Sequence, residues 1–262
     1  KRSVLVVGGG PGGMEAAITA AARGYDVELW EKSNRLGGNL WAAGLPTFKQ
    51  DVLRLIEYME NKVYRSGVNV RLMKEATAEE ILRGNYDKVV LASGSDSLMP
   101  PIDGIENAVA SSEILLGKGK PGKQVVVIGG GLVGCETAAY VKESAEQVTI
   151  VEMLDDILLL ANHCRNNDQA LRAMLAKRGV NIVAHARVKK ITSDSVIYEK
   201  DGKTLTIPCD TVVIAAGYKS RNALEKELDG KVKSLSVVGD AVSPRKIMAS
   251  VHEAYHAIRL ME

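Results

Sequence analysis

The hydrophobic residues of this chain fall in short continuous runs that alternate with longer amphipathic or polar segments. Residues 4–7, 89–92, 125–128 and 212–215 are apolar runs without a polar interruption. Such a run is typical of a parallel strand that is buried on both faces. Residues 48–66 instead place apolar side chains at helical spacing. Together these patterns predict an α/β fold with parallel sheets.

The order of these elements is repeated within the chain. Residues 4–7, 12–23 and 27–31 are predicted to form a strand, an alanine-rich helix and a strand, and residues 124–152 repeat that order. Each repeat later contains an acid, an apolar run and a glycine turn. These closing segments are residues 87–94 and 210–217. The remaining predicted elements are strands at 68–72 and 180–184, a helix near 167–178, and a small β-meander at 188–192, 195–199 and 203–207.

The end of the chain is predicted to return to the first repeat. A strand at 235–238 and a helix from about residue 247 are too short to form a domain of their own. The Pro/Gly-rich residues 99–104 and the segment 218–233 are predicted to be crossings between two domains. We therefore expect two domains of the same α/β fold, the second inserted into the first. Their expected limits are residues 1–109 with 221–262, and residues 110–220.

Each repeat has a glycine fingerprint between its first strand and its helix. The fingerprint residues are Gly8, Gly10 and Gly13, and Gly129, Gly131 and Gly134. In a G-x-G-x-x-G turn, the first glycine allows a sharp turn, the second lets the backbone approach a pyrophosphate, and the third lets the helix pack closely. The helix then presents free N–H groups and its positive dipole end to the phosphates. Two fingerprints therefore predict two Rossmann-like dinucleotide-binding domains, the second inserted into the first, with one dinucleotide site in each.

Acidic and glycine residues at the strand ends extend both sites. Glu31 and Glu152 end the second strand of each repeat, where an acid accepts hydrogen bonds from ribose hydroxyls. Gly94 and Gly217 end the later strands and are expected to contribute to cofactor binding. Glu152 would repel a 2′-phosphate, and residues 153–156 contain no cation, so NADH is expected rather than NADPH in the second site.

Composition excludes several other classes of protein. The chain has 262 residues, of which 46% are hydrophobic and 25% charged, as in an ordinary α/β protein. Its net charge of +2 gives no indication of a nucleic-acid partner. No apolar stretch approaches the roughly 18 residues of a membrane span, and no signal peptide precedes Ser3. A cytoplasmic protein without a membrane or nucleic-acid partner is expected.

The three cysteines, Cys135, Cys164 and Cys209, are widely spaced. This spacing favours a reducing compartment and excludes the close cysteine pair of flavin disulfide reductases. Two interpretations apply to Cys135, near the start of the second fingerprint helix: a thiol whose pKa the helix lowers, or a small buried helix residue, which we favour. No catalytic side chain is assigned, because hydride transfer between two cofactors requires no protein acid or base.

A metal-site pattern occurs near the end of the chain. His252, Glu253 and His256 match the HExxH motif of zinc proteases. A zinc site needs a third protein ligand, which usually lies downstream, and few residues follow. We therefore interpret the segment as a helix surface and assign no metal site. The adjacent His163 and Cys164 are likewise interpreted as part of a loop.

Gly239-Asp240, after the last predicted strand, completes a wider resemblance. The order of elements resembles the two-dinucleotide flavoprotein superfamily, in which an NAD(P)H domain is inserted into an FAD domain. The resemblance implies that the first repeat binds FAD and the second a nicotinamide cofactor. It also implies that Asp240 binds the ribityl chain and that the segment around Met248 faces the isoalloxazine. Arg221 and Arg245 have two interpretations, a contact to a cofactor phosphate or a solvated charge.

A narrower resemblance rests on the loops of the first repeat. Its motifs are Leu36-Gly37-Gly38-Asn39-Leu40, Leu45-Pro46, Leu91-Ala92-Ser93-Gly94 and Pro100-Pro101-Ile102-Asp103-Gly104-Ile105. They are similar to the C-terminal half of the 2,4-dienoyl-CoA reductase and 2-enoate reductase family, NADH:flavin oxidoreductases of the old-yellow-enzyme group. This resemblance implies that Asn39 and Lys49 lie beside FAD and that Ala92 lies near its adenosine side.

The same resemblance implies a module that passes hydride from NADH to FAD. That family also has an N-terminal barrel with FMN and a 4Fe-4S cluster, for which this chain has neither the length nor the cysteines. The barrel is therefore the expected partner, and the start just before the first strand favours a fragment of the enzyme. Two alternatives are an ADP-binding structural domain without electron transfer and a stand-alone NADH:acceptor reductase. Gly239-Asp240 favours FAD, because ADP has no ribityl chain.

Overall fold

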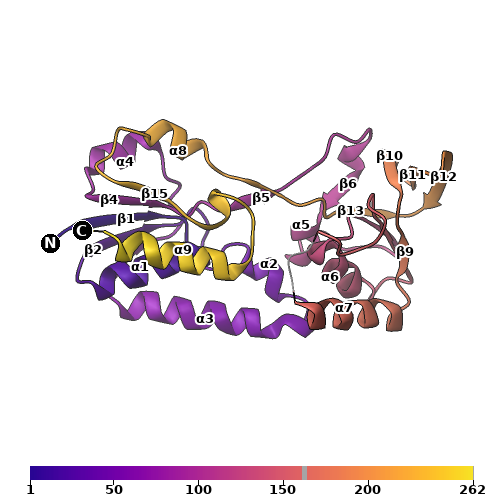
Figure 1. Cartoon of the computed structure of the whole chain (residues 1–262), viewed down its shortest axis with the longest axis horizontal. Coiled ribbons are helices and arrows are strands. Elements are labelled where there is room, and N and C mark those ends of the chain that lie inside the picture. The colour runs from indigo at the N-terminus through magenta and orange to yellow at the C-terminus, as the bar shows by residue number, and fades with distance from the viewer. Residues whose placement is uncertain (161–163, 262) are drawn as a thin grey trace. The chain divides into compact units, whose positions relative to one another are not determined.

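The computed structural model describes residues 1–160 and 164–261 (Figure 1). Contacts divide the chain into two compact units. Unit 1 comprises Lys1–Gly44, Lys49–Asp96 and Lys219–Glu262, and unit 2 comprises Leu45–Phe48 and Ser97–Tyr218. Two short strands, β5 (Ser95–Ser97) and β14 (Tyr218–Ser220), pair where the chain passes between the units.

Unit 1 contains a five-stranded parallel sheet in the order β15-β4-β1-β2-β3. Its strands are β1 (Ser3–Val7), β2 (Asp26–Trp30), β3 (Asn69–Arg71), β4 (Lys88–Leu91) and β15 (Leu235–Val237). The edge strand β15 follows the whole of unit 2 in the chain, so the sheet is completed by a segment distant in sequence.

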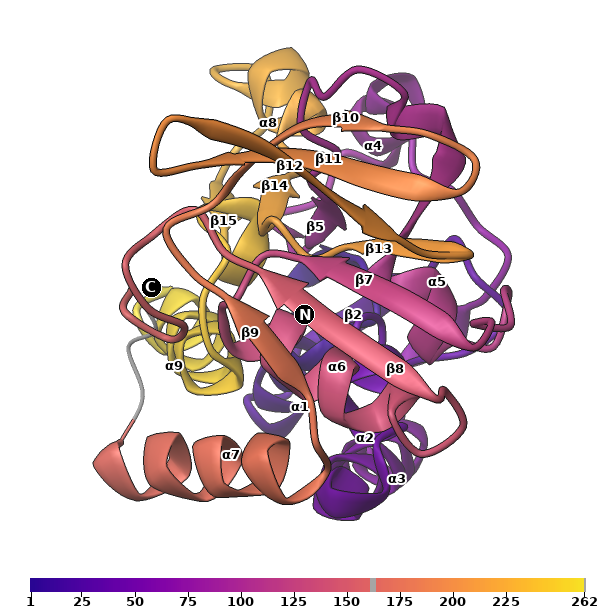
Figure 2. The ribbon, with the colours of Figure 1, turned by 90° about the vertical axis from the view of Figure 1, so that its right-hand side faces the viewer.

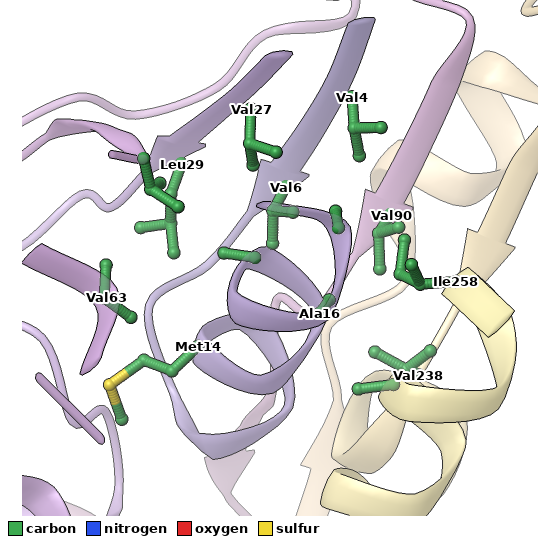
Figure 3. Close-up of a cluster of buried hydrophobic side chains, with 14 of the residues drawn as sticks. Val4, Val6, Met14, Ala16, Val27, Leu29, Val63, Val90, Val238 and Ile258 are labelled. Carbon is green, nitrogen blue, oxygen red and sulfur yellow. The ribbon is translucent and has the colours of Figure 1, made fainter. Parts of the chain in front are cut away.

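Alternate residues of β1 enter two separate cores, which explains its uninterrupted apolar run. Val4 and Val6 pack with α1 (Pro11–Ala22), α3 (Gln50–Arg65) and α9 (Ile247–Arg259) in the cluster shown in Figure 3. Leu5 and Val7 belong to the opposite cluster, to which α4 (Ala78–Gly84) and α8 (Ala223–Leu228) contribute. The other short elements of this unit are α2 (Leu40–Gly44) and the 3₁₀ turn η3 (Gly239–Ala241).

Unit 2 repeats this topology in a five-stranded parallel sheet of order β6-β13-β7-β8-β9. The strands are β6 (Ala108–Ala110), β7 (Gln124–Ile128), β8 (Gln147–Val151), β9 (Asn181–Val183) and β13 (Thr211–Ile214). One core contains residues of α5 (Ser111–Leu115), α6 (Leu132–Val141) and α7 (Arg165–Lys177).

The opposite core of unit 2 is covered by strands rather than helices. An antiparallel sheet of β10 (Arg187–Ile191), β11 (Ser195–Lys200) and β12 (Lys203–Pro208) forms the predicted meander (Figure 2). Its inward residues Val196 and Tyr198 pack with Val126 and Val212 of the parallel sheet. The central strands β7, β8 and β13 of unit 2 therefore also contribute to cores on both faces of their sheet.

The structure differs from the sequence-based division at both crossings, in the assignment of Leu45–Phe48 to unit 2, and in several short elements. The sequence placed the first boundary at residue 109, whereas unit 1 ends this segment at Asp96, since β6 pairs with β13. The short elements α4, α5, β6 and α8 were not expected. Ile81 of α4 and Leu228 of α8 show why such elements form, because both are buried in the unit 1 core. Packing rather than helix length stabilises them.

Replacing Ile81 by alanine is expected to lower the free energy of unfolding of unit 1 by about 2–4 kcal/mol, because it removes a core side chain. Ile81 is 1% exposed, whereas its neighbour Leu82 is 38% exposed. The matched control Leu82→Ala should cost less than about 1 kcal/mol. Both tryptophans, Trp30 and Trp41, belong to unit 1, so their fluorescence during urea unfolding measures the effect. Equal losses in the two variants would contradict the packing role of α4.

Candidate dinucleotide-binding sites

The first and third glycines of each fingerprint are required by the protein's own backbone. Gly8 has a φ of +102°, and a Cβ on it would lie 2.3 Å from the carbonyl oxygen of Ala92. A Cβ on Gly13 would lie 1.8 Å from the carbonyl oxygen of Gly8. In unit 2, a Cβ on Gly129 would lie 2.4 Å from the carbonyl oxygen of Ala215, and a Cβ on Gly134 would lie 1.9 Å from the carbonyl oxygen of Gly129. No side chain fits at any of these positions.

The second glycine of each fingerprint has a different environment. A Cβ on Gly10 or Gly131 would meet no atom of the described residues within 4 Å. Both glycines have ordinary extended backbone, with φ of −73° and −75°. The fold itself therefore does not require glycine there. The open space fits a pyrophosphate that approaches the backbone closely.

The helix that follows each turn begins at this open space. Gly10 and Gly131 are the N-cap residues of α1 and α6, and no side chain of the described chain caps either helix. The N–H groups of a first helical turn lack intrahelical partners, and the dipole favours an anion there. Each unit therefore presents a feature suited to a phosphate at the carboxyl edge of its sheet.

The two strand-end acids support the glycine turns. Glu31 is 8% exposed, and its Oε2 accepts a hydrogen bond of 2.6 Å from the N–H of Gly9. Glu152 accepts the equivalent bond of 2.5 Å from Gly130. The second carboxylate oxygen accepts from Ser33 in unit 1 and from Leu154 in unit 2, at 2.7 and 2.8 Å. Sequence reasoning missed this role; the assigned contact with ribose stays a prediction.

Residues 36–40, one of the motifs of the narrower resemblance, lie against the first glycine turn. Gly37 donates a hydrogen bond of 2.8 Å to the carbonyl oxygen of Gly9. Leu36 is fully buried, and its side chain would meet a Cβ on Gly9 at 2.6 Å. This packing places Asn39 near the turn, where its side chain donates a hydrogen bond of 3.3 Å to the carbonyl oxygen of Ser95.

Ser95 connects Asn39 to the Gly-Asp motif and was not identified from the sequence. It is 1% exposed, and its hydroxyl donates a hydrogen bond of 2.9 Å to Oδ2 of Asp240. The other carboxylate oxygen of Asp240 accepts a bond of 3.0 Å from the N–H of Arg245. Asp240 is thus held by Ser95, which is distant in sequence, and by the backbone of the nearby Arg245. The only sequence signal for Ser95 is its place directly after the glycine turn of β4.

The remaining assigned residues are placed as follows. Ala92 directly follows β4 and extends its pairing with β1, because its N–H donates a hydrogen bond to the carbonyl oxygen of Val7. The carbonyl oxygen of Ala92 faces Gly8. Gly94 has a φ of +72° and accepts a hydrogen bond from the N–H of Arg221. Gly217 has a φ of +103°, Lys49 ends the 3₁₀ turn η1 (Thr47–Lys49), and Met248 is 62% exposed in the first turn of α9. Their cofactor contacts stay predictions.

The two loop arginines are engaged in ion pairs. Arg221 forms a two-pronged pair with Asp96, with a distance of 2.8 Å from Nε to Oδ2, and also donates to the carbonyl oxygen of Ser93. Hydrogen bonding within this pair raises the pKa of Arg221 and lowers that of Asp96. Arg245 pairs with Oε1 of Glu253 at 2.6 Å. Each arginine therefore has a carboxylate partner, and a contact with a cofactor phosphate stays a prediction.

The glutamate of the HExxH segment has a structural role. Oε2 of Glu253 accepts a hydrogen bond of 2.8 Å from the N–H of Gly239. Within residues 1–160 and 164–261, no group of three or more His, Cys, Asp or Glu side chains could hold a metal ion. Cys164 is exposed, and His163 lies outside the described residues.

Cys135 is a buried helix residue, as favoured. Its Sγ lies 3.4 Å from the carbonyl oxygen of Gly130. Burial raises the pKa of its thiol to about 12, so the alternative of a thiol activated by the helix is wrong. Burial also raises the pKa of Cys209, to about 11.

Two parallel α/β units, each with a glycine turn and a strand-end acid, define the class of two-dinucleotide-binding proteins. The model of the pyridine nucleotide-disulphide oxidoreductase family matches residues 2–255, and the chain belongs to that family. Members of the family bind FAD and NAD(P)H. The two-dinucleotide fold expected from the sequence is confirmed.

Several relatives match the chain over almost its whole length. It is 35% identical to a cinnamate reductase of Clostridium sporogenes over 98% of its residues and 39% of the relative. It is 39% identical to an NADH oxidase of Thermoanaerobacter brockii, over 97% and 40%. A solved 2-naphthoyl-CoA reductase matches with a TM-score of 0.93 and 33% identity, over 100% of this chain and 40% of the other.

The chain thus spans about two fifths of the length of these relatives. The resemblance to the dinucleotide-binding half of the 2-enoate reductase group is confirmed, and the chain is a flavin oxidoreductase module. None of the helices in the described ranges is long and apolar enough to span a membrane.

Gly10→Ala is expected to weaken FAD binding at least about tenfold, because the new methyl group occupies the space suited to the pyrophosphate. The same change should alter the free energy of unfolding by no more than about 1 kcal/mol, the scale of an N-cap substitution. Gly13→Ala is the contrasting control, since its Cβ would overlap the carbonyl oxygen of Gly8 at 1.8 Å. Flavin fluorescence titration and urea unfolding measure the two effects. Unchanged FAD affinity in Gly10→Ala would contradict the assignment.

Proposed function

We propose that this chain passes hydride from NADH to FAD, with FAD in unit 1 and NADH in unit 2. The observation that carries the assignment is the Asp240 carboxylate, which Ser95 and the N–H of Arg245 hold at both oxygens. A carboxylate accepts hydrogen bonds, and a ribityl chain supplies hydroxyl donors that ADP lacks. The sequence has one Gly-Asp pair, Gly239-Asp240, and it belongs to unit 1.

The protein's contribution is to bind and orient the cofactors. When both are bound, NADH supplies a hydride that the flavin accepts, so the cofactors carry the redox chemistry. In each unit the glycine turn and the helix N-terminus accommodate a pyrophosphate. Glu31 and Glu152 accept hydrogen bonds from the adenosine ribose. Asn39 and Lys49 lie beside the FAD of unit 1, and Ala92 lies near its adenosine side. Gly94 contributes to the site in unit 1 and Gly217 to the site in unit 2.

The charges around Glu152 support a preference for NADH over NADPH. The carboxylate is fixed at the end of β8 by the N–H groups of Gly130 and Leu154. Asp155 follows and contacts His185, with 2.8 Å between Oδ1 and Nδ1. Arg172 is paired with both Asp156 and Asp168. A 2′-phosphate would therefore meet fixed negative charge, whereas a 2′-hydroxyl can donate to Glu152.

The acceptor of the electrons from FAD is proposed from the similarity to the relatives. Because the chain spans about two fifths of their length, we propose an N-terminal FMN and 4Fe-4S barrel as its partner, which would select the final substrate. The three described cysteines are free, which supports a reducing, cytoplasmic setting.

The first test is an anaerobic reduction. The chain is loaded with FAD, free flavin is removed, and NADH or NADPH is added while the oxidised-flavin absorbance is followed. Retained flavin that NADH bleaches faster than NADPH is the expected result. Retained flavin that neither nucleotide bleaches would contradict the hydride transfer. Failure to retain FAD together with tight ADP binding would contradict the assignment of unit 1.

Glu152→Gln is expected to reduce the preference for NADH over NADPH by about tenfold, because it removes one negative charge beside the 2′ position. Glu146→Gln is the matched control: Glu146 precedes the opposite end of β8 and is exposed, pairing with Lys123. The ratio of flavin-reduction rates with the two nucleotides measures the preference. The assignment fails if both variants keep the wild-type ratio, or if both change it equally.

A further inference from the structure

Glu253 connects the helix α9 to the Gly-Asp motif. Its Oε2 accepts a hydrogen bond of 2.8 Å from the N–H of Gly239. Its Oε1 forms an ion pair of 2.6 Å with the guanidinium of Arg245. The backbone N–H of Arg245 in turn donates to Oδ1 of Asp240, at 3.0 Å. One carboxylate on α9 thus holds the residues on both sides of Asp240.

The turn that Glu253 holds is tightly constrained. Gly239 has a φ of +66°, in the left-handed region that favours glycine. A Cβ on Gly239 would lie 2.7 Å from Oγ of Ser250, another α9 residue. The turn therefore packs directly on α9, and Glu253 supplies the acceptor for an N–H in that packed region. Without that acceptor, a partly buried donor is left unsatisfied.

One residue distant in sequence and one nearby segment define the orientation of the Asp240 carboxylate. Ser95 holds Oδ2 from the segment that follows β4. Glu253 acts on Oδ1 indirectly, through the loop of Arg245. Each carboxylate oxygen can accept more than one hydrogen bond, so both remain able to accept from a hydroxyl of a bound ligand. Fixing the carboxylate lowers the entropic cost of such binding.

We propose that Glu253 is a positioning residue for the flavin, acting through Gly239 and Arg245 on Asp240. The proposal rests on the proposed function, in which unit 1 holds FAD. It assigns the HExxH-like segment to cofactor positioning: the glutamate is used, while His252, exposed on the same helix, takes no part.

The test compares Glu253→Gln, Glu253→Ala and the control His252→Gln in the full chain. Glutamine keeps an acceptor for Gly239 but loses the charge that pairs with Arg245, whereas alanine loses both. The dissociation constant for FAD is expected to rise about tenfold in Glu253→Gln and about 100-fold in Glu253→Ala. His252→Gln should bind FAD as the wild type does.

Two further measurements separate positioning from general stability. In the FAD-free chain, hydrogen exchange of the Gly239 amide, followed by NMR, should be faster in Glu253→Ala than in the wild type. The thermal midpoint of FAD-free Glu253→Gln should stay within a few degrees of the wild type. In a double-mutant cycle, Arg245→Gln should weaken FAD binding, and the double variant with Glu253→Gln should be no weaker than the worse single variant.

The outcomes distinguish the proposal from the function on which it rests. If the wild type binds FAD and both Glu253 variants bind it equally well, the positioning role is overturned and the proposed function stands. A fall in thermal midpoint with no loss of FAD affinity also overturns it, as do additive effects in the cycle or unchanged exchange at Gly239. If the wild type binds no FAD, the proposal and the assignment of unit 1 are overturned together.

Discussion

The fold of each unit depends on one close approach between backbone segments. The carbonyl oxygen of the first fingerprint glycine lies where a Cβ on the third glycine would stand, as at Gly8 and Gly13. This approach brings the start of the helix directly over the end of the first strand. The helix N-terminus, the strand-end acid and the second glycine then meet at one edge of the sheet. In unit 2, Gly129 and Gly134 establish the same arrangement, so a single steric constraint generates both candidate sites.

The two units share this turn but differ in what surrounds it. Both have a five-stranded parallel sheet with the fingerprint strand in the middle. Helices cover both faces in unit 1, whereas the β10–β12 meander covers one face in unit 2. Unit 1 also has Asp240, held by Ser95 and by the N–H of Arg245. The glycine turn suits a dinucleotide in general, and we propose that the surroundings of each turn determine which dinucleotide fits.

Much of the fold could be predicted because its signals are local. The apolar run of β1 and the glycines after it lie within a few residues of one another, and the meander has clear alternation. The roles of Ser95 and Glu253 were not predictable, since each depends on a residue brought near by the fold. The helix α4 is short, and the burial of Ile81 stabilises it together with its N-cap Thr77, whose side chain accepts a hydrogen bond from the N–H of Glu80. Local sequence patterns were therefore sufficient to predict the glycine turns, whereas the residues that support these turns could be identified only from the structure.

The discontinuity of unit 1 has a consequence for the order in which the chain folds. The edge strand β15 and the helix α9 follow all of unit 2 in sequence. Until they are synthesised, the core of unit 1 lacks Val238, Ala254 and Ile258, and α1 has no α9 to pack against. Unit 2 has no such requirement, because β6 precedes its fingerprint strand in the chain. During synthesis, unit 2 can therefore reach its complete fold first, while unit 1 still exposes apolar surface of the kind that chaperones bind.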